Sequence, residues 1–169
     1  MSRKFAFGIL IGCLLSLFIT GIPAFAQSPR PVIIDTDMVT DDWMAILLTF
    51  KNSDFDVKAI TVTGTGFAYC DSGTRIALGL VALAEKGDIP VSCWRDEPLF
   101  GDNAPPTDWR VNMEGAEALG LPAGGEASDM NAVDLFTATL EASPEKVIVL
   151  ALGPLTNVGA ALDAKPELA

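Results

Sequence analysis

The sequence of 169 residues contains no histidine and only three cysteines. Without histidine, the chain itself cannot supply a Ser-His-Asp triad, a Cys-His dyad or a His-ligated zinc site. Basic side chains are also scarce, because 11 Lys and Arg residues stand against 22 Asp and Glu residues. An acidic surface repels the phosphate backbone of nucleic acids, so we expect no nucleic-acid partner. In contrast, 50% of the residues are hydrophobic, which is typical of a globular protein.

The N-terminus has the pattern of a secretory signal peptide, which we assign to residues 1–26. Arg3 and Lys4 precede an apolar stretch over residues 5–22, and an Ala-Phe-Ala cleavage site ends at Ala26. An uncleaved membrane anchor is the alternative, since the apolar stretch is nearly long enough to span a bilayer. We expect cleavage after Ala26, a secreted or periplasmic protein, and no stable membrane anchor.

Two cysteines, Cys70 and Cys93, lie beyond this N-terminal segment. An oxidising compartment outside the cytoplasm would permit a disulfide between them. Their spacing in the sequence does not show that the disulfide forms, because bridging depends on the separation of the two Cα atoms. From the sequence, a disulfide and two buried free thiols both remain open.

Short apolar segments alternate with helical patterns along residues 27–169. The expected strands cover 31–34, 57–62, 89–91 and 147–152, and the expected helices cover 43–48, 76–84, 132–140 and 155–162. Asp71 or Ser72 is expected to cap the second helix, and residues 94–128 to form a long loop with a short helix near 114–119. This alternation predicts an α/β fold with a doubly wound, mostly parallel sheet and helices on both faces. Ligands of such sheets bind at the carboxyl ends of the strands.

Four carboxylates fall within eight residues directly after the first expected strand, at positions Asp35, Asp37, Asp41 and Asp42. Like charges this close raise one another's pKa unless a cation or hydrogen bonds compensate for them. Calcium or magnesium, which prefer oxygen ligands, would compensate best. The alternative is ordinary capping of the next helix by Asp41 and Asp42, with Asp35 bonded into the scaffold. The pattern favours a metal site or a catalytic site.

Three segments together resemble the inosine-uridine nucleoside hydrolase family. Residues 35–42 resemble its N-terminal signature D-x-D-x-G-x-D-D, residues 150–157 (Leu-Ala-Leu-Gly-Pro-Leu-Thr-Asn) look like its G-P-L-T-N turn, and residues 61–66 lie where the family has its second-strand loop. The resemblance implies a nucleoside hydrolase-like fold in a secreted bacterial-type member. It also implies hydrolysis of the N-glycosidic bond of ribonucleosides to ribose and free base, using a calcium-bound water. A small-molecule nucleoside is then the expected partner, and a homo-oligomer is possible.

The resemblance assigns roles by position in the motifs. Asp37 would ligate calcium and act as the general base. Asp42 would ligate the ion with its carboxylate, and Leu152 with its backbone carbonyl. Asp41 would hydrogen-bond a ribose hydroxyl. Thr65 stands where the family has a sugar-binding asparagine, so it is a candidate substrate contact, with a plain turn residue as the alternative.

The sequence departs from the family pattern at Met38 and Val39, where proline and glycine are usual. Family members are also much longer, and their later part carries another metal-ligating aspartate and, in many of them, a histidine near the leaving base. The resemblance therefore implies that residues 27–169 are the N-terminal part of the domain, with a sheet that is incomplete at its C-terminal side. It implies weak or no hydrolase activity for this chain alone. Asn157 matches the motif, although a role at a helix start explains it equally well.

Two other functions compete with this interpretation. The segment from Asp35 to Val39 also resembles the D-x-D signature of haloacid-dehalogenase-like phosphatases, with Asp35 as nucleophile and Asp37 as acid or base. That chemistry gives no role to the pair at 41–42. The second alternative is a non-catalytic nucleoside- or sugar-binding protein, in which Trp94 or Trp109 from the long loop could stack on the ligand.

Overall fold

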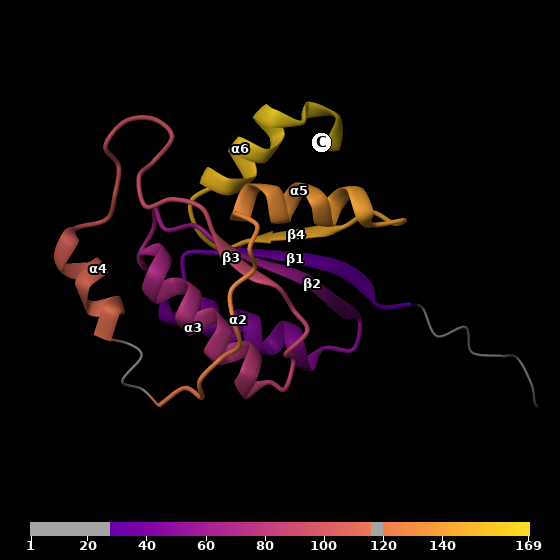
Figure 1. Cartoon of the computed structure of the whole chain (residues 1–169), viewed down its shortest axis with the longest axis horizontal. Helices are drawn as coiled ribbons and strands as arrows, with labels where there is room; N and C mark the ends of the chain where they lie inside the picture. Colours follow the sequence, from indigo (N-terminus) through magenta and orange to yellow (C-terminus); the bar gives the residue numbers. More distant parts are fainter. Residues whose placement is uncertain (1–27, 116–119) are drawn as a thin grey trace, which may run out of the picture.

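The computed structural model describes residues 28–115 and 120–169, and it contains a four-stranded sheet. The strands are β1 (Arg30–Thr36), β2 (Phe55–Val62), β3 (Val91–Cys93) and β4 (Ile148–Ala151). They lie in the order β3-β2-β1-β4, and every neighbouring pair is parallel (Figure 1). The expected signal peptide lies outside the described residues. Within the two described ranges, no helix has the length and apolar character needed to cross a bilayer.

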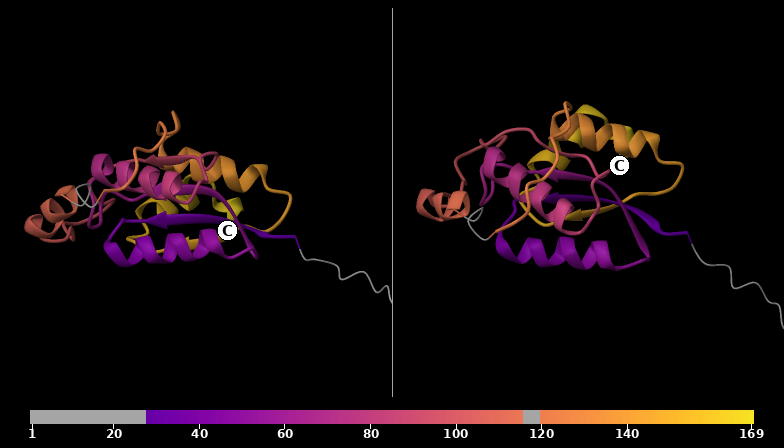
Figure 2. Two further views of the ribbon diagram at one scale, coloured as in Figure 1. Left: turned by 90° about the horizontal axis from the view of Figure 1, so that it is seen from below. Right: turned by 60° about the horizontal axis from the view of Figure 1, so that its bottom comes forward.

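Helices cover both faces of the sheet. They are α2 (Thr40–Lys51), α3 (Cys70–Leu83), α4 (Thr107–Glu114), α5 (Ala132–Ala142) and α6 (Thr156–Ala164), followed by a 3-10 turn, η2 (Pro166–Leu168). In Figures 1 and 2, α2 and α3 lie on one side of the strands, while α5 and α6 lie on the other. This arrangement confirms the predicted α/β fold with a parallel sheet.

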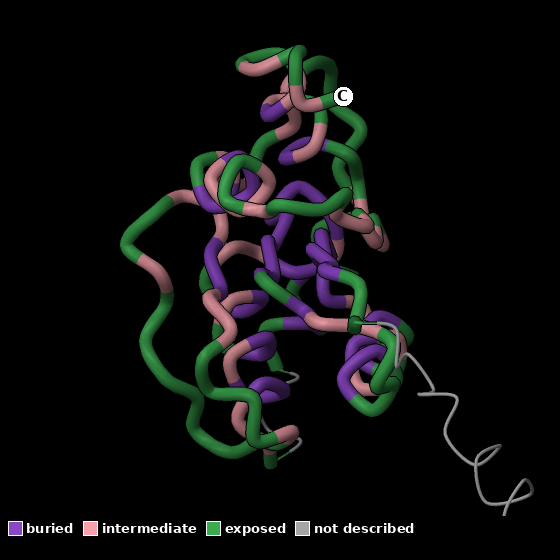
Figure 3. The backbone as a smooth tube through the Cα atoms, turned by 90° about the vertical axis from the view of Figure 1, so that its right-hand side faces the viewer, coloured by how far each residue is buried: buried purple, intermediate pink, exposed green. Residues whose placement is uncertain are grey.

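Alternation along β1 explains how one strand serves two cores. Val32 and Ile34 point to the layer of α2 and α3, where Ile46 is also fully buried. Ile33, between them, points to the opposite layer and packs with Phe136 of α5. Successive side chains of a strand point to opposite faces, so an unbroken apolar run suits a strand that is covered on both sides. In Figure 3 the buried residues accordingly lie along the middle of the molecule.

Three details differ from the sequence-based expectation. The third strand begins at Val91 and not at 89, because Pro90 has no N–H to donate and only its carbonyl joins the ladder, accepting from the Ile60 amide. The expected cap of α3 by Asp71 or Ser72 is wrong, since the cap position is Tyr69, whose side chain makes no capping bond, and the first helical amide, that of Cys70, donates to the Asp96 carboxylate at 2.6 Å. The short helix within the long loop is α4, which ends where the expected one began, while residues 116–119 lie outside the described part.

A disulfide joins Cys70 to Cys93, with their Cα atoms 5.4 Å apart. It connects the first turn of α3 to the last residue of β3. The structure thereby decides between the two states that the sequence left open. The bridge lies at the carboxyl end of the sheet, where the loops after β2 and β3 begin.

Candidate functional site

The loops that follow β1, β2 and β4 meet at one edge of the sheet. The amide of Thr63, just after β2, donates to the carbonyl of Thr36 at 2.9 Å. The amide of Leu152, just after β4, donates to the carbonyl of Asp35 at 2.7 Å. The three segments that carried the family resemblance therefore come together at the carboxyl ends of the strands, the edge at which parallel sheets bind ligands.

Asp37 lies at the centre of this edge and is only 6% exposed. Its Oδ2 accepts a hydrogen bond from the Phe67 amide at 3.1 Å, and its backbone carbonyl accepts one from the Ala68 amide at 3.0 Å. Its other carboxylate oxygen, Oδ1, is buried and has no hydrogen-bond partner among the described residues. A buried carboxylate oxygen without a donor is unfavourable, so this atom is ready to bind an added ligand.

Two glycines allow the neighbouring backbone to approach Asp37. A Cβ atom at Gly66 would lie 2.2 Å from Asp37 Oδ2, and a Cβ atom at Gly153 would lie 2.8 Å from the Asp37 backbone nitrogen. Both distances are shorter than a Cβ atom normally comes to another heavy atom, so any other residue at either position would force its neighbours to move. The turn that carries the Leu152 carbonyl is thus packed directly against Asp37.

Asp42 is the second buried carboxylate of the site, in the first turn of α2. It accepts a hydrogen bond from the Thr36 hydroxyl at 2.6 Å. Burial raises its pKa to about 7, the negative charge of Asp37 adds to the increase, and the bond from Thr36 partly offsets it. Asp41, the next residue back, is exposed at the surface. Asp42 is therefore protonated more readily than an ordinary aspartate.

Asp35 has a different environment, although it is equally buried. Its Oδ1 accepts hydrogen bonds from the Thr61 hydroxyl at 2.6 Å and from the Asn157 amide at 2.8 Å. Burial nevertheless raises its pKa to about 6, because those two bonds compensate only in part. Asn157 also donates to the carbonyl of Val62, and it makes no cap at the start of α6. Its side chain joins the first turn of α6 to the ends of β1 and β2, so the alternative that it caps this helix is wrong.

Thr65 belongs to a short chain of buried hydroxyls. Its Oγ1 lies 3.0 Å from that of Thr63 and 2.8 Å from that of Thr156 at the start of α6. A hydroxyl can donate one hydrogen bond and accept two, so Thr65 retains the capacity for one further partner. The residue connects the loop after β2 to the turn after β4 and does more than form a turn.

Sequence reasoning missed the residues that hold the site from outside. Phe67 and Ala68 act through backbone amides, which no side-chain pattern reveals. Arg110 of α4 is 5% exposed, donates to the carbonyl of Gly64, and places its guanidinium carbon 3.7 Å from the centroid of the Tyr69 ring. A buried arginine is rare unless it is paired. The sequence does not show that Arg110 is buried, and its location in the long loop was the only hint of a functional role.

The two tryptophans of the long loop pack within the protein. The ring of Trp109 stacks on that of Phe67, with centroids 5.6 Å apart. The guanidinium of Arg95 lies over the ring of Trp94 at 5.1 Å. Trp109 is still 52% exposed, so it borders the surface beside the site.

By count of side chains, the acidic cluster of the described residues does not form a metal site. Within the described ranges, no three Cys, Asp or Glu side chains form a group that could hold a metal ion. Asp37 and Asp42 are two buried oxygen donors, and backbone carbonyls would have to add to them. Calcium takes six to eight oxygen ligands, so these residues match the type of donor that calcium needs but not the full number.

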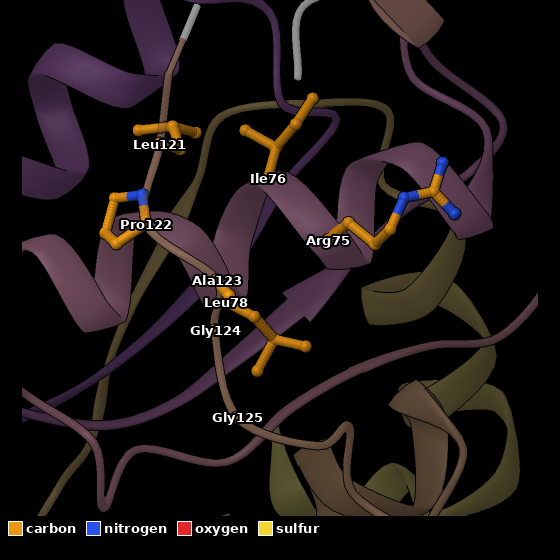
Figure 4. Close-up of a pocket in the computed structure, with 8 residues that line it drawn as sticks. All are labelled: Arg75, Ile76, Leu78, Leu121, Pro122, Ala123, Gly124 and Gly125. Atoms are coloured by element: carbon orange, nitrogen blue, oxygen red, sulfur yellow. The ribbon is translucent and has the colours of Figure 1, made fainter. Parts of the chain in front are cut away.

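A separate cavity of about 420 Å³ lies between α3 and the segment at 121–125 (Figure 4). Its lining residues are Arg75, Ile76, Leu78, Leu121, Pro122, Ala123, Gly124 and Gly125. None of them belongs to the strand-end cluster, and none is a carboxylate. The cavity therefore gives no reason to place the chemistry away from Asp37.

Known proteins with related sequences are nucleoside hydrolases. The chain is 37% identical over 142 residues to the pyrimidine-specific ribonucleoside hydrolase RihA of Citrobacter koseri, covering 82% of this chain and 44% of that protein. It is 35% identical over 132 residues to uridine nucleosidase 1 of Arabidopsis thaliana, covering 78% of this chain and 39% of that protein. The chain thus spans less than half the length of these relatives.

Solved structures agree on the fold. A purine-preferring ribonucleoside hydrolase from Gardnerella vaginalis superposes with a TM-score of 0.73 at 24% identity, covering 82% of this chain and 45% of that one. An inosine-guanosine nucleoside hydrolase superposes with a TM-score of 0.66 at 28% identity, covering 82% and 44%. The family model described as inosine-uridine preferring nucleoside hydrolase matches residues 32–169, which include all three site segments. From the strand-end cluster, the fold and these matches, we conclude that the chain belongs to the inosine-uridine preferring nucleoside hydrolase family.

Proposed function

We propose that the protein of which this chain is part hydrolyses the N-glycosidic bond of ribonucleosides. The observation that carries the proposal is the buried, unpartnered Oδ1 of Asp37 beside the second buried carboxylate, Asp42. The names of the relatives support a ribonucleoside as the substrate class. Those names include pyrimidine-specific and purine-preferring enzymes, so the base preference of this protein is left open.

Calcium is the cofactor that we propose for the site. Asp37 and Asp42 would hold it with carboxylate oxygens, and Leu152 with its backbone carbonyl, because the turn after Leu152 packs against Asp37. When bound, calcium would supply the positive charge that activates water and orients ribose hydroxyls. Further oxygen ligands, such as those of water and substrate, would be needed, since two carboxylates and one carbonyl are too few.

The carboxylates account for the chemistry of the reaction. As the C–N bond breaks, its electron pair leaves with the base, and the sugar gains oxocarbenium character that nearby negative charge stabilises. Water adds to the anomeric carbon, and Asp37 accepts its proton as the general base, a role worth about 10²–10⁴-fold in rate. Asp41, exposed at the rim, and the free hydrogen-bonding capacity of Thr65 would bind ribose hydroxyls.

Substitution of Asp37 by alanine tests the proposal. In the complete protein with calcium and a nucleoside, we expect Asp37→Ala to abolish the release of free ribose, because both a metal ligand and the base are lost. Retained turnover would contradict the assignment. For this chain without further segments, we expect weak or no activity.

Two other functions predict different observations on the complete protein. A non-catalytic nucleoside- or sugar-binding protein would bind nucleoside in calorimetry and release no base even after long incubation. The phosphatase alternative would form an aspartyl-phosphate on Asp35, but the side chain of this residue is fully buried and its Oδ1 already accepts two hydrogen bonds. Family membership also argues against the phosphatase.

Secretion and assembly complete the proposal. The signal peptide would direct export and be cleaved after Ala26, and the disulfide between Cys70 and Cys93 suits an oxidising compartment. Mass spectrometry of the exported protein, with Gln27 as the expected first residue, tests the cleavage. A homo-oligomer is expected from the family, and light scattering on the complete protein tests it.

A further inference from the structure

The loop after β2, residues 63–69, contains no charged side chain, yet it fixes the central carboxylate of the site. Two of its amides, those of Phe67 and Ala68, donate to the side chain and the backbone carbonyl of Asp37. Gly66 lies so close to Asp37 that a Cβ atom would overlap it. The position of the Asp37 carboxylate therefore depends on the position of this loop.

Helix α4 contacts the outer side of that loop through two consecutive residues. Trp109 stacks on Phe67, and Arg110 donates to the carbonyl of Gly64 while its guanidinium lies against the ring of Tyr69. The two contacts made by Arg110 reach both ends of the loop. A planar guanidinium is suited to this double task, because it can donate in its plane and stack through its face.

The environment of Arg110 is unusual for a group that only fills space. It is 5% exposed, its Nε has no hydrogen-bond partner, and no carboxylate of the described residues pairs with it. Burial of a cation without a counter-ion is unfavourable, and an apolar side chain would pack there at lower cost. An arginine in this place thus favours a positional role over a packing role.

We propose that Arg110 is a positioning residue, which holds the loop at 63–69 so that the Phe67 and Ala68 amides keep the Asp37 carboxylate in the orientation needed for metal binding and proton transfer. The inference rests on the proposed function only in its second step, from Asp37 to calcium and catalysis. Its first step, from Arg110 to the loop, is a statement about the structure alone and can be measured without substrate.

The first measurement is amide hydrogen exchange by NMR on the purified protein without calcium. In Arg110→Met, we expect the Phe67 and Ala68 amides to exchange about 10-fold faster relative to the Ile60 amide, which bonds to Pro90 within the sheet. Arg110→Lys, which keeps a cationic donor, should restore part of the protection. Arg30→Met is the matched control, because Arg30 also lies over an aromatic ring, that of Phe55, but at the opposite end of β1.

The second measurement addresses the site. We expect Arg110→Met to weaken calcium binding in calorimetry about 10-fold and to lower kcat of the complete protein more than it raises KM, since proton transfer needs the more exact geometry.

Equal acceleration of exchange at the Phe67, Ala68 and Ile60 amides would mean that Arg110 only stabilises the fold. Unchanged exchange would mean that Arg110 does not hold the loop. Either result overturns the proposal. If Arg110→Met does not fold, the same comparison is made with Arg110→Lys, in which smaller changes in the same two amides are expected. If Asp37→Ala remains active while the loop responds as expected, the proposed function fails and the role of Arg110 in the loop stands.

Discussion

The loops after β1 and β2 lie side by side at the same sheet edge, but they are built in opposite ways. The first, residues 35–42, runs from the end of β1 into the first turn of α2 and carries four carboxylates. Two of their buried oxygens, Asp35 Oδ2 and Asp37 Oδ1, have no hydrogen-bond partner among the described residues. The second, residues 63–69, carries no charge. It is held by the disulfide at the next residue, Cys70, by the buried Arg110 and by the stacking of Trp109 on Phe67. The reactive carboxylates and the groups that fix their geometry therefore lie on different segments of the chain.

We expect the largest effect from a substitution in the uncharged loop that displaces the Asp37 carboxylate. In Gly66→Ala, the new Cβ would overlap the Asp37 side chain, so the carboxylate has to move. We expect ribose release by the complete protein to fall about 100-fold or more, because displacement of a reacting group by about 1 Å has effects of that size.

Gly87→Ala is the control for this substitution, since nothing lies within 4 Å of a Cβ at that position. It adds the same methyl group far from the site and should leave turnover unchanged. Wild-type turnover in Gly66→Ala would show that the close approach of this loop does not restrict Asp37.

The disulfide fixes the end of the second loop, next to Cys70, and has no direct bond to the first loop. It closes a separation of 23 residues, so its loss in Cys70→Ser/Cys93→Ser should destabilise the protein by about 3 kcal/mol, as measured by urea unfolding. Under conditions in which the protein stays folded, loss of the disulfide should increase the amide exchange rate of Phe67, in the second loop, more than that of Asp42, in the first. The Asp42 amide donates to the Val39 carbonyl. An equal increase in both amides would show that the bridge stabilises the edge as a whole.

The order of strands and helices could be predicted from the sequence for a physical reason. The segment 31–34 is continuously apolar because both faces of β1 are covered, and the acidic residues of the first turn of α2 mark where the strand has ended. The bounds of β3 could not be predicted as well, because the ladder role of Pro90 depends on which strand lies beside it. The length of α4 depends on contacts with α3 and the loop after β2, which are not local in sequence.

The same distinction applies to the site. The crowding of carboxylates in the sequence predicted an acidic cluster, and the family resemblance singled out Asp37 and Asp42 within it. The structure buries both side chains close to one another. The bond from Asn157 to Asp35 joins residues 122 positions apart, so no local pattern reveals it. Arg110 was missed for the same reason. Residues that act through a backbone amide, or that contact residues distant in the sequence, can be recognised only from the three-dimensional structure.

The smallest expected effect concerns Asp35, the braced carboxylate of the first loop. Burial raises its pKa from 3.8 to about 6 in the folded protein, so the fold favours its neutral form. The contribution to stability is fully present below the unfolded-state pKa and is lost as the pH rises through about 6. Asp35→Asn keeps an oxygen acceptor for Thr61 and Asn157 but cannot ionise, so it removes this loss.

We therefore expect the free energy of unfolding of the unmodified protein to fall, relative to that of Asp35→Asn, by about 2–3 kcal/mol between about pH 4 and pH 7. Urea unfolding at several pH values, in a buffer with a calcium chelator, measures the difference. The titration of Asp42 is common to both proteins, so it cancels as long as the substitution leaves that residue in place. Parallel pH profiles would mean that Asp35 is as well compensated as an exposed carboxylate, and the first loop would then contain a single pair of reactive acids, Asp37 and Asp42, beside a carboxylate that is purely structural.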